Sequence, residues 1–224
     1  MAIKPILFNT EMVRAILDGR KTCTRRLVKF LPGENSQWTG YIKDGLMLYN
    51  GRNEPCIRKV PYQPGDIMYV RETWQYLYEL DGNEQIIEGT GKYYYAATDT
   101  IPFDTYVDAS GVTHERVPWH PSIHMPKEAA RIWLKVTNVR VERLQDITPK
   151  GAESEGVGNL FYDDIGYGEK NYGTEVDPEY GIAKEQFAWL WESTIKKSDL
   201  DRYGWNANPW VWVIEFERCE KPKK

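Results

Sequence analysis

The sequence predicts an α+β fold, in which many short strands form a small, open β-barrel and two or three helices pack against it. Short apolar or alternating runs, separated by Gly, Pro, Asn and Asp, recur along the chain and are typical of strands. Helical periodicity occurs in only a few segments. Aromatic residues make up 13% of the chain, which favours either an aromatic, sheet-rich core or a groove lined with stacking side chains.

Composition restricts the classes of partner. A chain of 224 residues that is 41% hydrophobic can build a core, as one large domain or two small ones. The net charge of -4 argues against a protein that coats nucleic acid by charge alone, so any polynucleotide contact must be local. No apolar run approaches the length of about 18 residues that a membrane span needs, and the start of the chain lacks the apolar segment of a signal peptide. We therefore expect a cytoplasmic protein with no membrane partner.

Metal and disulfide chemistry are not predicted. Cys23, Cys56 and Cys219 are far apart and odd in number, which fits neither a disulfide framework nor a zinc cluster. His120 and His124 have the spacing of metal ligands only on a helix, and nearby prolines disfavour a helix there. We expect no metal and no cofactor.

The first elements are a strand and a capped helix. Residues 3–8 predict the strand, and Asn9 is placed to cap the helix that follows. Apolar residues at helical spacing within 12–17 give that helix one buried face. Gly19 stands where a left-handed residue ends a helix, and residues 24–28 predict the next strand.

A hairpin and a buried strand follow. Residues 41–49 alternate around Asp44 and Gly45, a strong signal for a tight hairpin. Residues 67–70 form an apolar run that predicts a buried strand. Arg71 and Glu72 come directly after it, and charges at such a position either close the end of a barrel or face a ligand. Both interpretations stay open.

The middle of the chain predicts further ribbons and one long strand. Ribbons are expected at 92–97 and 105–117, the second turning at 108–111. The longest alternating run, 130–144, predicts a central strand, and Asn138 marks a change in the phase of its alternation.

Two helices and a strand complete the prediction. Thr148 as N-cap, Pro149 at the first position and Gly156 past the end indicate a short helix. An amphipathic pattern predicts a helix over 183–196, and an apolar run predicts a closing strand over 208–216. No linker divides the chain, so we expect one domain over residues 1–224.

The stretch 19–26, Gly-Arg-Lys-Thr-Cys-Thr-Arg-Arg, concentrates chemistry in eight residues. A threonine hydroxyl needs a neighbouring base to act as a nucleophile, and Lys21 can serve if burial and nearby positive charges favour its neutral form. The arginines at 20, 25 and 26 supply such charges and can hold a phosphate or carboxylate. Taken alone, the stretch is weak evidence for such chemistry and favours a solvated basic turn after a helix.

Together with Pro64-Gly65-Asp66, the 152–156 helix end and the closing 212–216 strand, this stretch resembles the ASCH domain family of PUA-like barrels. The likeness is strongest to the longer ASCH-type proteins of phages and prophages, and it spans nearly the whole chain. It implies an open β-barrel with two or three helices. Residues at about 31–60, 75–118 and 157–181 are then insertions, and we expect the last of these to be a mobile or inserted loop.

A bacterial member of this family is an acetylcytidine amidohydrolase, and its functional positions match Lys21, Thr24 and Glu155 here. The resemblance implies that Lys21 deprotonates Thr24, that Thr24 attacks the acetyl carbonyl, and that Glu155 orients Lys21 or handles protons at the leaving amine. We expect six residues to bind substrate through charge or stacking: Arg20, Arg26, Arg71, Glu72, Trp74 and Trp119.

Two other hypotheses compete with the enzyme. PUA-like barrels commonly hold RNA, so the arginines and aromatics can form a non-catalytic RNA or modified-nucleotide binding module. Alternatively, Lys21 and Glu155 form a structural ion pair that closes one end of the barrel. The expected partner is a modified nucleoside or RNA, and the sequence gives no prediction of the acyl group or of oligomeric state.

Overall fold

The computed structural model of the chain describes residues 1–33, 38, 40–43, 46–79, 81–83, 85–101, 106–107, 112–114, 118–157 and 178–222. Its backbone contacts divide into two compact units. Unit 1 comprises Met1–Leu17, Ile67–Leu134 and Arg218–Lys224, and unit 2 comprises Asp18–Asp66 and Lys135–Glu217. Most of the loop expected at 157–181 and the turn expected at 108–111 lie outside the described residues. The expectation of a single domain stays a prediction.

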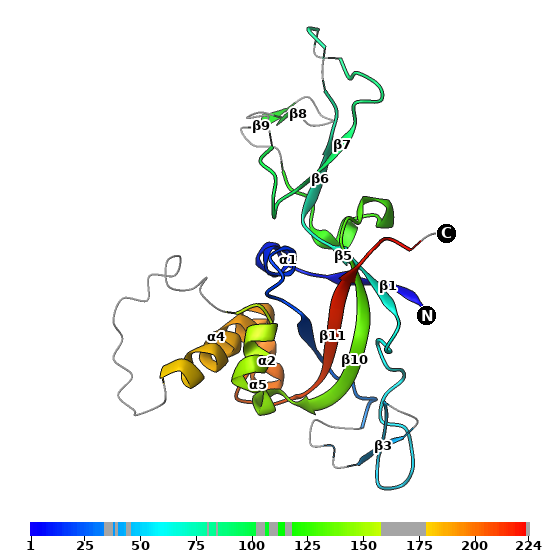
Figure 1. The fold of residues 1–224 in the computed structure, drawn as a ribbon, viewed down its shortest axis with the longest axis vertical. Coiled ribbons are helices and arrows are strands. Elements are labelled where there is room, and N and C mark those ends of the chain that lie inside the picture. Colours follow the sequence, from blue (N-terminus) through cyan, green and yellow to red (C-terminus); the bar gives the residue numbers. More distant parts are fainter. Residues whose placement is uncertain are drawn as a thin grey trace. The chain divides into compact units, whose positions relative to one another are not determined.

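The fold is α+β, as the sequence predicts, and its largest element is a mixed five-stranded sheet with the strand order β1-β5-β10-β11-β2 (Figure 1). These strands are β1 Ile3–Leu7, β5 Ile67–Arg71, β10 Trp133–Arg143, β11 Trp210–Cys219 and β2 Cys23–Leu27. Strands β1 and β5 are parallel, whereas β11 and β2 are antiparallel. Within the described residues, no helix is both long and apolar enough to cross a lipid bilayer.

Unit 1 contains the helix α1 (Thr10–Leu17) and two small hairpins. Asn9 caps α1 as predicted, because its Oδ1 accepts a hydrogen bond of 2.8 Å from the Met12 N–H. One hairpin pairs β6 (Trp74–Leu77) with β7 (Lys92–Tyr95), and the other pairs β8 (Tyr106–Val107) with β9 (Thr113–His114). Single turns of 3-10 helix follow at Ser122–His124 and Lys127–Ala129.

Unit 2 contains the predicted hairpin, in which β3 (Tyr41–Lys43) pairs with β4 (Met47–Tyr49). The turn at residues 44–45 lies outside the described residues. Two elements differ from the prediction, since α4 (Pro178–Thr194) begins five residues before the expected start at 183 and α5 (Leu200–Tyr203) was not expected. The phase change in β10 is confirmed, because Thr137 and Asn138 are both exposed between buried valines.

The short helix of unit 2, α2 (Pro149–Ser154), has the capping that its sequence predicts. Thr148 Oγ1 accepts a hydrogen bond of 3.0 Å from the Gly151 N–H, Pro149 occupies the first position, and Gly156 follows with a φ of 89°. Helices α2, α4 and α5 gather on one side of β10 and β11 (Figure 1). Residues suited to capping therefore stand at both ends of α2.

The register of β11 and β2 defines two faces of this part of the sheet. Val211 and Val213 pack with residues of α2 and α4 in one apolar core, and we call their side of the sheet the helix face. Directly opposite residues of an antiparallel pair share a face, so Arg25, the partner of Val213, lies on the helix face. Thr24 and Arg26 pair with Ile214 and Trp212, and they therefore lie on the opposite face.

Candidate functional site

The basic stretch 19–26 leads into β2 through bonds to two other segments. Gly19 has a φ of 77°, the left-handed conformation that the sequence predicts. The Thr22 N–H donates to the Ser154 carbonyl at the end of α2 (2.9 Å), and the Thr22 carbonyl accepts from the Phe216 N–H of β11 (2.9 Å). Lys21 and Glu155 form an isolated β-bridge. The start of β2 thus lies between β11 and the end of α2.

Lys21 and Glu155, 134 positions apart in the sequence, meet through their side chains. Lys21 Nζ donates to Glu155 Oε2 at 2.6 Å and to the Glu155 carbonyl at 2.8 Å. Their side chains are 0% and 3% exposed. The contact brings together two of the three residues for which the sequence suggests catalysis, and their catalytic roles stay predictions.

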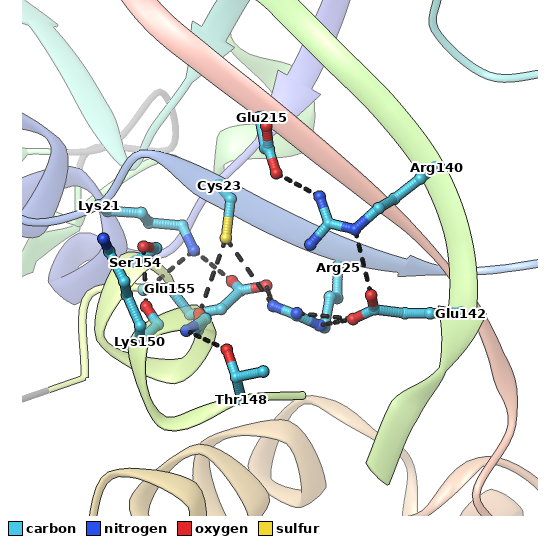
Figure 2. Close-up of polar contacts among 11 residues, drawn as sticks. Lys21, Cys23, Arg25, Arg140, Glu142, Thr148, Lys150, Ser154, Glu155 and Glu215 are labelled. Atoms are coloured by element: carbon cyan, nitrogen blue, oxygen red, sulfur yellow. Dashed lines mark hydrogen bonds and ion pairs between the residues drawn. The ribbon is translucent and has the colours of Figure 1, made fainter. Parts of the chain in front are cut away.

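Arg25 of β2 joins this pair (Figure 2). Its Nη1 donates to Glu155 Oε1 at 3.1 Å, while Nη2 donates to Glu142 Oε1 at 2.7 Å. Arg140 continues the network, bonding both Glu142 and Glu215. Glu155 therefore receives two buried cations, and the network extends from α2 across the helix face of β2, β10 and β11.

The neighbouring carboxylates raise the pKa of Arg25. Burial lowers the pKa of Arg25, but Glu155 and the hydrogen-bonded Glu142 outweigh that effect and leave its pKa raised. Arg25 is therefore a permanent cation that holds two carboxylates in place.

Cys23 lies on the same face, with its Sγ 3.8 Å from both the Gly151 carbonyl and Arg25 Nη1. Burial, followed by the charge of Glu155, raises the pKa of Cys23 to about 12, and the neighbouring cations only partly oppose this. A thiol protonated at neutral pH is a poor nucleophile. Cys23 is thus a packing residue beside the charged network.

The raised pKa of Cys23 predicts a loss of stability at high pH. The unfolded thiol, with a pKa of 9.0, ionises before the folded one, so the contribution is intact below pH 9.0 and disappears as the pH rises toward about 12. In this range we expect the unfolding free energy of the wild type to fall faster than that of Cys23→Ala, by up to about 1.4 kcal/mol per pH unit. Urea titrations at several pH values measure the difference, and parallel curves would contradict it.

Thr24 is placed differently from Lys21 and Glu155. It is 1% exposed and lies on the opposite face of β2, together with Arg26. Burial lowers the pKa of Arg26, while Glu155 and Tyr62 act in the opposite direction. The charge of Glu155 thus reaches Arg26. The candidate site spans both sides of β2, which is the last strand of the sheet.

The remaining predicted residue of unit 2 has local partners. Arg20 donates to the Gly156 carbonyl at 2.9 Å and to Asp18 Oδ2 at 3.0 Å. Arg20, the residue before Lys21, is therefore bonded to Gly156, the residue after Glu155. This bond helps to hold Lys21 and Glu155 next to each other.

Four predicted substrate-binding residues belong to unit 1. Glu72 is 1% exposed and accepts two bonds of 2.9 Å from Arg131, so it has a structural partner that the sequence did not suggest. Arg71 donates to the Ile123 carbonyl. Trp74 packs against His120, and Trp119 is half-buried. Their substrate-binding roles stay predictions.

Sequence reasoning missed three members of the network, Arg140, Glu142 and Glu215. One signal was available, since Glu215 is a lone acid inside the apolar run of β11. A charge in such a run favours an oppositely charged partner on the neighbouring strand. In the described part of the chain, no three or more His, Cys, Asp or Glu side chains are grouped to hold a metal ion.

No family model, curated protein or solved structure matches the chain. The likeness to ASCH domains therefore rests on the residues quoted above.

Proposed function

We propose that this chain is an amidohydrolase that removes an acyl group from a cytidine-like base, in a nucleoside or in RNA. Its fold would be the open β-barrel of the ASCH type, with the insertions described above. The observation that carries the proposal is the 2.6 Å bond between Lys21 and Glu155, which joins two of the three positions that match the acetylcytidine amidohydrolase. A buried lysine that bonds a carboxylate and a carbonyl is well placed to exchange protons.

The reaction follows from these groups. Lys21 first passes its ammonium proton to Glu155, its partner at 2.6 Å. The neutral amine then accepts the hydroxyl proton of Thr24, and the Thr24 oxygen attacks the acyl carbonyl. The proton then passes to the exocyclic nitrogen of the base as the carbon–nitrogen bond breaks, and water hydrolyses the resulting acyl ester. Arg26 shares the face of Thr24 and is suited to stabilise the negative oxygen.

This chemistry requires a rearrangement. Lys21 bonds Glu155 on the helix face, whereas Thr24 lies on the opposite face. The proposal therefore requires Lys21 to turn around the start of β2 toward Thr24 when substrate binds. Glu155 retains Arg25 as a partner during that movement.

The test uses purified protein and N4-acetylcytidine, with cytidine and acetate measured by chromatography. We expect turnover by the wild type and a loss of about 10²-fold or more in Lys21→Met, which keeps the length of the side chain but removes the amine. Lys29→Ala, at an exposed lysine just after β2, is the control and should keep full activity. If a folded Lys21→Met variant hydrolyses acetylcytidine at the wild-type rate, Lys21 takes no part in the mechanism.

The position of Thr24 favours a second candidate, a binding module of PUA-like type without hydrolysis. In that case the buried Lys21–Glu155–Arg25 cluster is structural, and Arg26 faces the ligand from the other side of β2. This candidate predicts salt-sensitive affinity for RNA and no acetate release from acetylcytidine. The same assay separates the two.

A further inference from the structure

A pocket of about 640 Å³ lies in unit 2, within the size range of small-ligand sites. Its apolar walls include Leu46 and Met47 at the start of β4, and Val139 of β10. These walls come from the segment for which the sequence suggests an insertion and from the central strand. The insertion therefore helps to build a cavity.

Backbone bonds fix the segments that form the pocket. The Cys56 N–H donates to the Leu48 carbonyl of β4 at 2.7 Å, and the Gly65 N–H donates to the Val136 carbonyl of β10 at 2.8 Å. Asp66 Oδ2 accepts from the Gln63 N–H at 3.1 Å and closes the turn beside the pocket. The walls are thus formed before any ligand binds, which lowers the entropic cost of binding.

One residue of the pocket wall, Val139, lies on the face of the sheet that carries Thr24. Arg140 reaches Glu215 on the helix face, and Val139, one residue earlier in β10, points the other way. Thr24 and Arg26 share that opposite face. Tyr62, which acts on the pKa of Arg26, lies in the segment that lines the pocket.

The polar lining of the pocket is cationic. Arg58 and Lys59 are exposed side chains at its wall, and Gln63 adds an amide. No acidic residue is among the described residues that line it. Guanidinium and ammonium groups bind phosphate oxygens, and the apolar walls suit the uncharged part of the same ligand. This combination fits an anion attached to a largely apolar body.

We propose that this pocket binds a phosphorylated nucleoside, with Arg58 and Lys59 on the phosphate and the base against Leu46, Met47 and Val139. The substrate class of the proposed amidohydrolase is then a nucleotide rather than a free nucleoside. The assignment of a nucleotide as the substrate rests on the proposed function, whereas the binding of a phosphorylated nucleoside in the pocket does not.

Isothermal titration calorimetry with cytidine 5′-monophosphate, cytidine and inorganic phosphate tests the inference. We expect the wild type to bind the monophosphate at least about tenfold more tightly than either of the other two, since bonds to a charged group contribute strongly. The double variant Arg58→Ala/Lys59→Ala should lose that preference. The control Lys196→Ala/Lys197→Ala removes two exposed charges from the same unit outside the pocket lining, and it should keep the preference.

Equal wild-type affinity for cytidine and its monophosphate would overturn the inference, and this comparison needs no variant. Inorganic phosphate that binds as tightly as the monophosphate would also overturn it. So would a folded Arg58→Ala/Lys59→Ala protein with an unchanged preference. A protein that binds the monophosphate but never releases acetate refutes the proposed function alone, because calorimetry with an unacylated ligand requires no hydrolysis.

Discussion

Replacing Glu155 with glutamine is expected to lower the unfolding free energy of the protein by about 3–5 kcal/mol, the effect typical of removing one partner from a buried ion pair. Glu155 accepts a bond of 2.6 Å from Lys21 and one of 3.1 Å from Arg25, and all three side chains are at most 3% exposed. The amide of glutamine keeps the shape but leaves excess positive charge in a buried site. Urea unfolding followed by circular dichroism measures the loss.

The matched control is Glu153→Gln, because Glu153 lies on the same helix but is exposed. It should change the unfolding free energy by less than about 0.5 kcal/mol. The double variant Lys21→Met/Glu155→Gln should recover part of the loss, since it removes one of the two cations that bond Glu155 while Glu142 still serves Arg25. If Glu155→Gln lowers the unfolding free energy by less than about 1 kcal/mol, the charge of Glu155 does not stabilise the fold as predicted.

Replacing Thr24 with valine is expected to reduce the turnover of acetylcytidine by about 10³-fold or more if Thr24 is the nucleophile. Valine has nearly the same volume and β-branching, so packing opposite Ile214 is kept and only the hydroxyl is lost. Thr24→Ser restores a hydroxyl and should retain measurable activity. Saturating rates for the three proteins give the comparison.

Mass spectrometry of acid-quenched protein adds a direct test of the same role. An acyl group on the peptide that contains Thr24 is expected in the wild type and absent in Thr24→Val. Hydrolysis by Thr24→Val at the wild-type rate would exclude the threonine nucleophile. The affinity for cytidine 5′-monophosphate should be equal in both proteins, because Thr24 is not part of the pocket lining.

Local signals predicted local structure well. The caps of α1 and α2 depend on residues within a few positions of each helix end, so Asn9 and Thr148 could be recognised from the sequence. The early start of α4 was missed because its first residues follow a stretch without periodicity. Propensity alone does not set such a boundary.

The charged network was only partly predictable. The resemblance supplied Lys21 and Glu155, but the partners Glu142 and Glu215 depend on strand order and register, which contacts across the sheet decide. The face on which Thr24 lies also could not be predicted from the sequence. A three-residue spacing from Lys21 suggests proximity on a turn, whereas alternation along β2 separates the two side chains.

The pairing of Lys21 with Glu155 also protects the border of the sheet. β2 ends the strand order, and a terminal strand normally offers free amides and carbonyls to strands of other molecules. At its beginning, Ser154 and Glu155 occupy the outward side. The backbone groups of residues 21 and 22 that bond the end of α2 are thus not available to a strand from a neighbouring chain.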